Sequence, residues 1–163
     1  MKHFKLPKNQ SGFTLIELLV VIGILAILLA ITLIAINPNK HFQDTRNAKR
    51  SSDVSAILDS IYEYQSANSG TLPPSVQAAS IPAGSKVAST DINLCDVVPT
   101  YLADLPMDPD TTATGSSITG GPTPCNVSTT AYDTGYEIAK TANGRFTVSA
   151  PSAEGGATIR VTR

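Results

Sequence analysis

The stretch that decides the fold is FTLIELLVVIGILAILLAITLIAI, which runs from Phe13 to Ile36. Its one ionisable side chain is Glu17. A helix needs about 20 apolar residues to cross the hydrocarbon core of a bilayer, so this stretch is long enough to span a membrane. The segment before it, MKHFKLPKNQSG, contains Lys2, Lys5 and Lys8 and no acidic residue. Because lysines stay preferentially in the cytoplasm, the remainder of the chain is predicted to lie outside it.

Two ordinary explanations of the apolar stretch are a secretory signal and a plain membrane anchor. A secretory signal has an apolar region of about 7–15 residues and a small-residue cleavage site, which this longer run lacks. A plain anchor leaves Glu17 unexplained, because an acidic group inside a membrane helix costs about 2.5–3.5 kcal/mol. A cut between Gly12 and Phe13 would supply a partner, the new α-amino group four residues before Glu17. Between helices offset along a shared axis, this carboxylate could meet the amine of the next subunit.

The Lys-bearing leader, Gly12 and the following FTLIELLVVIGILAIL resemble the class III signal of type IV pilins and pseudopilins. The resemblance implies that prepilin peptidase removes residues 1–12, that Phe13 becomes the N-methylated mature terminus, and that Glu17 acts in assembly. It also implies a homo-oligomeric helical filament, with an assembly ATPase and an inner-membrane platform protein as partners. The precursor would lie in the cytoplasmic membrane as a single-pass protein, and the filament at the cell surface.

A second helical pattern follows the membrane and assembly helix of residues 13–36. The sequence Asn37-Pro38 predicts a kink or short break, because proline lacks an N–H and clashes with the preceding turn. Within residues 37–69 one apolar stripe has helical spacing, formed by Val54, Ile57, Leu58, Ile61 and Tyr62. Gly70 provides a stop signal. The basic cluster from Arg46 to Arg50 is predicted to be a solvated helix face and not a nucleic-acid site, in keeping with the net charge of −1.

Residues 70–163 are predicted to form a loop-rich head, because frequent prolines exclude long helices there. Strand-like alternation occurs near the end, at Tyr136, Ile138 and Lys140 and again at Phe146, Val148 and Ala150. A three-residue loop, Ala142–Gly144, pairs Ile138 with Val148 and Tyr136 with Ala150, which aligns the apolar faces. A third strand is expected around Ile159 and Val161. The predicted fold class is therefore α+β, with a long N-terminal helix packed on a small antiparallel sheet, and the resemblance makes this layout pilin-like.

The two cysteines, Cys95 and Cys125, lie on the non-cytoplasmic side in the predicted topology, where disulfides persist. A bridge between them would stabilise the head by about 3–4 kcal/mol in the chain-entropy model. A redox pair, the alternative, would have closer spacing such as C-x-x-C. The bridge would enclose most of the segment from Thr111 to Thr130, half of which is Ser or Thr, and this composition predicts an exposed loop.

The segment LPMDPD, which ends at Asp110, superficially resembles part of a calcium loop. It lacks the glycine and glutamate of an EF-hand, because Ala113 and Thr119 occupy those positions. Some pseudopilins that resemble this chain bind calcium in their C-terminal loops, so Asp108 and Asp110 are candidate calcium ligands. The simpler interpretation is a Pro-Asp turn, and no other cofactor is expected.

The sequence contains no arrangement typical of an active site. There is no serine elbow, phosphate loop or metal-binding histidine cluster, and we expect no enzyme activity. The function predicted is therefore a structural subunit of a type IV pilus-like filament. Two alternatives stay open: a major pseudopilin of a type II secretion or DNA-uptake system, and an anchored binding module that never polymerises.

Overall fold

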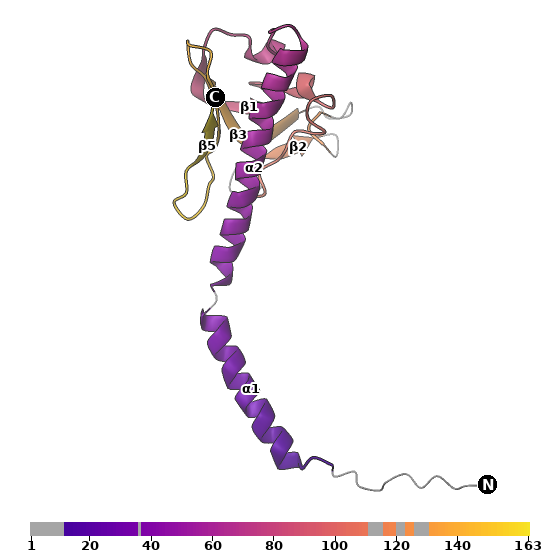
Figure 1. The fold of residues 1–163 in the computed structure, drawn as a ribbon, viewed down its shortest axis with the longest axis vertical. Coiled ribbons are helices and arrows are strands. Elements are labelled where there is room, and N and C mark those ends of the chain that lie inside the picture. Colours follow the sequence, from indigo (N-terminus) through magenta and orange to yellow (C-terminus); the bar gives the residue numbers. More distant parts are fainter. Residues whose placement is uncertain (1–11, 36, 111–115, 120–122, 126–130) are drawn as a thin grey trace, which may run out of the picture. The chain divides into compact units, whose positions relative to one another are not determined.

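The computed structural model describes residues 12–35, 37–110, 116–119, 123–125 and 131–163 (Figure 1). The chain divides into two compact units, Met1–Asn39 and Lys40–Arg163. Helix α1 spans Leu15–Ala35, and helix α2 spans Pro38–Ala67. The predicted interruption at Asn37-Pro38 is confirmed, since α2 begins with the proline. Its missing N–H has no intrahelical partner in that position, so proline suits the start of a helix.

Helix α1 is apolar on every side. Residues 15–34 are all exposed, and the large apolar side chains among them are between 51% and 86% exposed. Leu15–Ile34 is long and apolar enough to cross a membrane, by length and composition alone. Because α1 has no polar face to turn towards water, its surface has to be covered by lipid or by other protein.

Helix α2 ends in a Schellman motif, as the stop signal at Gly70 predicts. The N–H of Gly70 donates to the carbonyl oxygen of Gln65 at 2.8 Å, and Ser69 has a left-handed φ of 55°. The predicted stripe faces inward: Val54, Ile57, Leu58 and Ile61 are all 0% exposed. These side chains form one core with apolar residues of the sheet, which α2 crosses on one face (Figure 1).

The sheet has five antiparallel strands, which confirms the α+β class. They are β1 (Ile81–Ala88), β2 (Ser117–Thr119), β3 (Ala131–Lys140), β4 (Phe146–Ala150) and β5 (Ile159–Thr162). Their order is β1-β3-β4-β5, and β2 also pairs with β3. Two short 3-10 helices, η1 (Pro74–Val76) and η2 (Cys95–Val97), lie in the connections.

The hairpin of β3 and β4 has the predicted register, with Ile138 opposite Val148. The N–H of Gly144 donates to the carbonyl oxygen of Thr141 at 2.9 Å, and Gly144 has φ of 80°. The loop is therefore the predicted three-residue turn with a left-handed glycine. The third strand is also confirmed, because β5 pairs with β4 along its length.

Two strands were not predicted, because their sequences do not show the alternation of apolar and polar residues. In β1, Pro82 and Gly84 interrupt the alternation of apolar residues, and the pairing with β3 has two register shifts. Strand β2 lies inside the region predicted as an exposed loop, so that prediction is wrong at Ser117–Thr119, which pair with β3. The rest of that prediction falls largely on residues 111–115, 120–122 and 126–130, outside the described residues.

Candidate functional site

The predicted cleavage point lies ahead of the first helix. Gly12, Phe13 and Thr14 precede α1 and are not helical, and Phe13 is 83% exposed. An added Cβ at Gly12 would meet nothing within 4 Å among the described residues. The bond between Gly12 and Phe13 thus lies in a non-helical segment, with open space around the Gly12 Cα. The remainder of the leader, residues 1–11, lies outside the described residues, and cleavage and methylation stay predictions.

Glu17 forms a capping box with Thr14 at the start of α1. Its Oε2 accepts hydrogen bonds from the Thr14 backbone N–H (2.8 Å) and hydroxyl (2.7 Å). In return, the Glu17 N–H donates to Thr14 Oγ1 at 3.3 Å. Such reciprocal bonds satisfy donors that a helix N-terminus otherwise leaves unpaired. The sequence signal for this cap is the Thr-x-x-Glu spacing of Thr14 and Glu17.

The capping box leaves half of the carboxylate available. Both hydrogen bonds from Thr14 end on Oε2, and Oε1 accepts no hydrogen bond from the described residues. A cationic group could therefore pair with Oε1 while the box stays intact.

The cysteines form the predicted disulfide. Cys95 and Cys125 are bonded, with their Cα atoms 5.4 Å apart. Cys95 begins η2, and the closed loop contains β2. The bridge therefore closes the loop that contains β2 onto η2.

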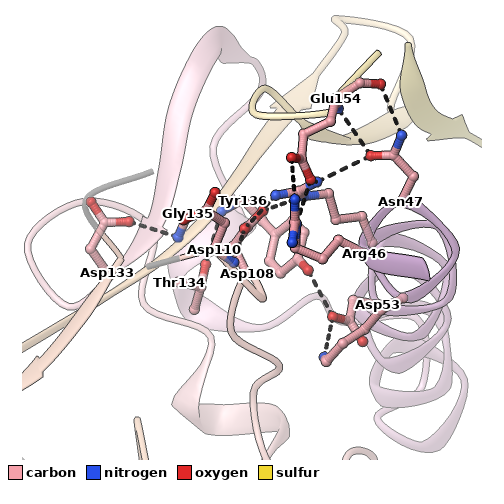
Figure 2. Close-up of polar contacts among 12 residues, drawn as sticks. Arg46, Asn47, Asp53, Asp108, Asp110, Asp133, Thr134, Gly135, Tyr136 and Glu154 are labelled. Atoms are coloured by element: carbon pink, nitrogen blue, oxygen red, sulfur yellow. Dashed lines mark hydrogen bonds and ion pairs between the residues drawn. The ribbon is translucent and has the colours of Figure 1, made fainter. Parts of the chain in front are cut away.

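The LPMDPD segment is anchored to α2 by a buried ion pair (Figure 2). Arg50 Nε donates to Asp108 Oδ2 at 2.8 Å, and Arg50 Nη2 donates to Asp108 Oδ1 at 2.9 Å. Both side chains are 0% exposed. The hydrogen bonds to Asp108 raise the pKa of Arg50, against the opposing effect of burial. Asp108 Oδ1 also accepts the backbone N–H of Asp110 at 2.8 Å.

These contacts give Asp108, a candidate calcium ligand, a structural role. A guanidinium occupies both oxygens of Asp108, and its positive charge would repel a bound cation. The described residues contain no group of three or more His, Cys, Asp or Glu side chains arranged for a metal ion. Calcium binding by Asp108 and Asp110 stays a prediction without a ligand set.

The basic cluster on α2, Arg46–Arg50, is not the solvated face that its composition predicts. Arg50 is fully buried, and Arg46 makes two hydrogen bonds to the Glu154 carboxylate, at 2.6 and 2.5 Å. Asn47 bonds the Glu154 backbone at both its amide atoms. The cluster therefore packs on the loop between β4 and β5, and only Ala48 and Lys49 are exposed as predicted. No local signal in the sequence identifies the acidic partners, which lie 58 to 108 residues away.

A tyrosine from the sheet completes the polar layer beneath α2. The Tyr136 hydroxyl donates to Asp53 Oδ2 at 2.7 Å, and Lys49 Nζ lies 2.6 Å from the same oxygen (Figure 2). Burial, and then the hydrogen bond to Asp53, raise the pKa of Tyr136 well above its usual range. Because its pKa is raised, this hydroxyl stays protonated and acts as a structural donor to Asp53.

The comparison with protein families identifies the N-terminal segment. Residues 7–33 match the family model described as the prokaryotic N-terminal methylation motif, a motif of structural and not catalytic proteins. No curated protein and no solved structure matches the chain. The match covers Gly12, Phe13 and the capping box, together with nearly all of α1. The chain thus carries at its N-terminus the class III prepilin signal of type IV pilins and pseudopilins.

Proposed function

We propose that the chain is the precursor of a structural subunit of a type IV pilus-like filament. Prepilin peptidase would cut between Gly12 and Phe13, and Phe13 would be N-methylated. The observation that carries the proposal is the uncovered apolar surface of α1, with one acidic side chain in its first turn, inside the matched methylation motif.

The physical argument concerns where the α1 surface can be covered. In a bilayer, helices gain no hydrophobic free energy by associating, since lipid tails are as apolar as the side chains. Outside the membrane the same surface must contact other subunits, at about 25 cal/mol for each Å² removed from water. Transfer from lipid to a filament core then needs external work, which supports an assembly ATPase and an inner-membrane platform protein as partners.

Glu17 would set the axial offset between neighbouring subunits. Its Oε2 would stay in the capping box with Thr14, and its Oε1 would accept the N-terminal amine of Phe13 from the next subunit. A charged pair of this kind is directional, whereas the surrounding apolar packing is not. The lysines of the leader would keep the N-terminus in the cytoplasm and the head outside, before the filament reaches the cell surface.

Mass spectrometry of the N-terminal peptide from native membranes tests the processing step. The expected peptide begins at Phe13 and carries one extra methyl group. A chain that still begins at Met1 would contradict the proposal, because Glu17 would then have no new amine to bind.

Two Glu17 variants separate the charge from the capping box. Glu17→Gln keeps an amide oxygen for the Thr14 donors but removes the negative charge, and Glu17→Ala removes both. Both variants should lose most filament assembly, whereas Glu63→Ala, which removes an exposed carboxylate from α2, should assemble normally. Normal filaments from Glu17→Gln would show that capping alone suffices and would refute the pairing with the amine.

The alternative filament is a short pseudopilus of a type II secretion or DNA-uptake system. The LPMDPD segment favours it, since the resemblance associates this segment with pseudopilins. Surface filaments released from the cells by shearing would support the pilus. If no such filaments are found and a Glu17 variant loses secretion or DNA uptake, the pseudopilus would be supported. An anchored binding module that never polymerises predicts no effect of either Glu17 variant on complexes.

A further inference from the structure

The first part of α2 is attached to the head in a different way from the rest of the helix. No residue of α2 before Arg50 is buried, and apolar packing begins at Val54. Four hydrogen bonds join Arg46 and Asn47 to Glu154, through its carboxylate and its backbone. These polar contacts, and not apolar burial, attach this part of α2 to the head.

The contacts of Glu154 form a compact arrangement, which we call the polar clip (Arg46, Asn47 and Glu154; Figure 2). The Arg46 guanidinium donates twice to the Glu154 carboxylate. Asn47 Nδ2 donates to the Glu154 carbonyl oxygen at 2.9 Å, and the Glu154 N–H donates to Asn47 Oδ1 at 3.0 Å. Glu154 lies in the loop between β4 and β5, beside the left-handed Gly155 and Gly156, so its backbone is a tight turn.

The two parts of α2 should differ in how easily they open. The Val54–Ile61 stripe is held by apolar burial, and separating it exposes the core. The polar clip is partly exposed, with side chains of Arg46 and Glu154 that are 33% and 20% accessible, so water can replace its bonds one by one. Arg50 also touches Glu154, but its two bonds to buried Asp108 keep it in the core when the clip opens.

We propose that the polar clip is a release point: residues 41–49 separate from the head and unwind as a unit, while Val54–Ile61 stays packed. Proteins open locally in such units, and the least stable are those with few buried apolar contacts. If the chain is a filament subunit, as proposed above, opening of the clip lets the head adjust to its neighbours without unfolding.

Amide hydrogen exchange of the full chain in non-ionic detergent micelles tests the proposal. In Glu154→Gln, which weakens the clip and keeps the side-chain size, exchange of residues 42–49 should accelerate about tenfold or more. Exchange of residues 54–61 should stay unchanged. Asn47→Ala, which removes the other half of the clip, should accelerate the same segment.

Asp59→Asn is the matched control, because it removes a different contact of α2, the exposed ion pair with Arg163. It should leave residues 42–49 unchanged. Equal acceleration of residues 42–49 and 54–61 in Glu154→Gln would overturn the proposal, since the clip would then stabilise the head as a whole. No acceleration would overturn it as well. The measurement needs no filaments, so a failure of filament assembly and a failure of the clip are distinguishable.

Discussion

Replacement of Asp108 by alanine would leave the guanidinium of Arg50 buried without its bidentate partner. Removal of one member of a buried ion pair typically costs about 3–5 kcal/mol, because the remaining charge is uncompensated. Arg50 Nη1 keeps a hydrogen bond to Glu154 Oε2 at 3.0 Å, which offsets part of this loss. We therefore expect the lower end of the range, about 3 kcal/mol. That is a large fraction of the stability of an ordinary domain, about 5–15 kcal/mol.

Urea unfolding of the full chain in non-ionic detergent measures this cost. The sequence has five tyrosines and no tryptophan, so near-ultraviolet circular dichroism of the tyrosines reports the packing of the head. With a slope of about 1.5 kcal/mol per molar urea, the midpoint should fall by about 2 M.

A double variant provides the internal comparison. Arg50→Met with Asp108→Leu removes both charges and keeps apolar volume in the core, and such replacements are often neutral or stabilising. The double variant should therefore unfold closer to the unmodified chain than Asp108→Ala does. A loss below about 1 kcal/mol in Asp108→Ala, or a double variant as unstable as the single one, would refute this account of the pair.

Three further predictions concern other contacts of the head. The guanidinium of Arg46, and then that of Arg50, lower the pKa of Glu154 from 4.5 to about 2. The contribution of Glu154 to the free energy of unfolding is therefore complete above the unfolded pKa and is lost as the pH falls from about 5 towards 2. Glu154→Gln should flatten that part of the curve of stability against pH in an acid titration. Cys125→Ser should lower the free energy of unfolding by about 3–4 kcal/mol, and a reducing agent should shift the urea midpoint of the unmodified chain but not of the variant. Lys140 Nζ donates to the carbonyl oxygens of Val76 and Ala78, at 3.1 and 2.7 Å, so Lys140→Met should cost about 1–3 kcal/mol in the same assay by leaving both acceptors without this donor.

Periodicity predicted the parts of the fold whose signals are local. The apolar stripe from Val54 to Ile61 follows the helical repeat of 3.6 residues, and the strands on either side of Gly144 follow the strand repeat of 2. Burial of one face is enough to determine which residues of each element point inward. The break at Pro38 follows from the geometry of proline alone. These features needed no knowledge of which segments meet in space.

The errors concern residues whose environment is set by distant partners. Arg50 looks like a surface residue, but it is buried because acceptors elsewhere in the chain satisfy its donors. Strand β1 forms despite Pro82 and Gly84, because the long central strand β3 offers a complete edge and the irregular residues are accommodated as register shifts. The cap formed by Thr14 is a local feature as well, because the Thr-x-x-Glu spacing alone predicts it.

The uniform surface of α1 has a consequence for symmetry. Because α1 is apolar on every side, its surface does not favour one orientation about the helix axis over another, so neighbouring helices could rotate about their own axes at little cost. In the proposed pairing, Glu17 would set a height along the axis, but one contact at the end of α1 leaves the apolar length of the helix without an angular preference. In a filament of the proposed kind, the angular step from one subunit to the next must therefore be encoded in the heads, and related chains with the same helix could build filaments of different twist.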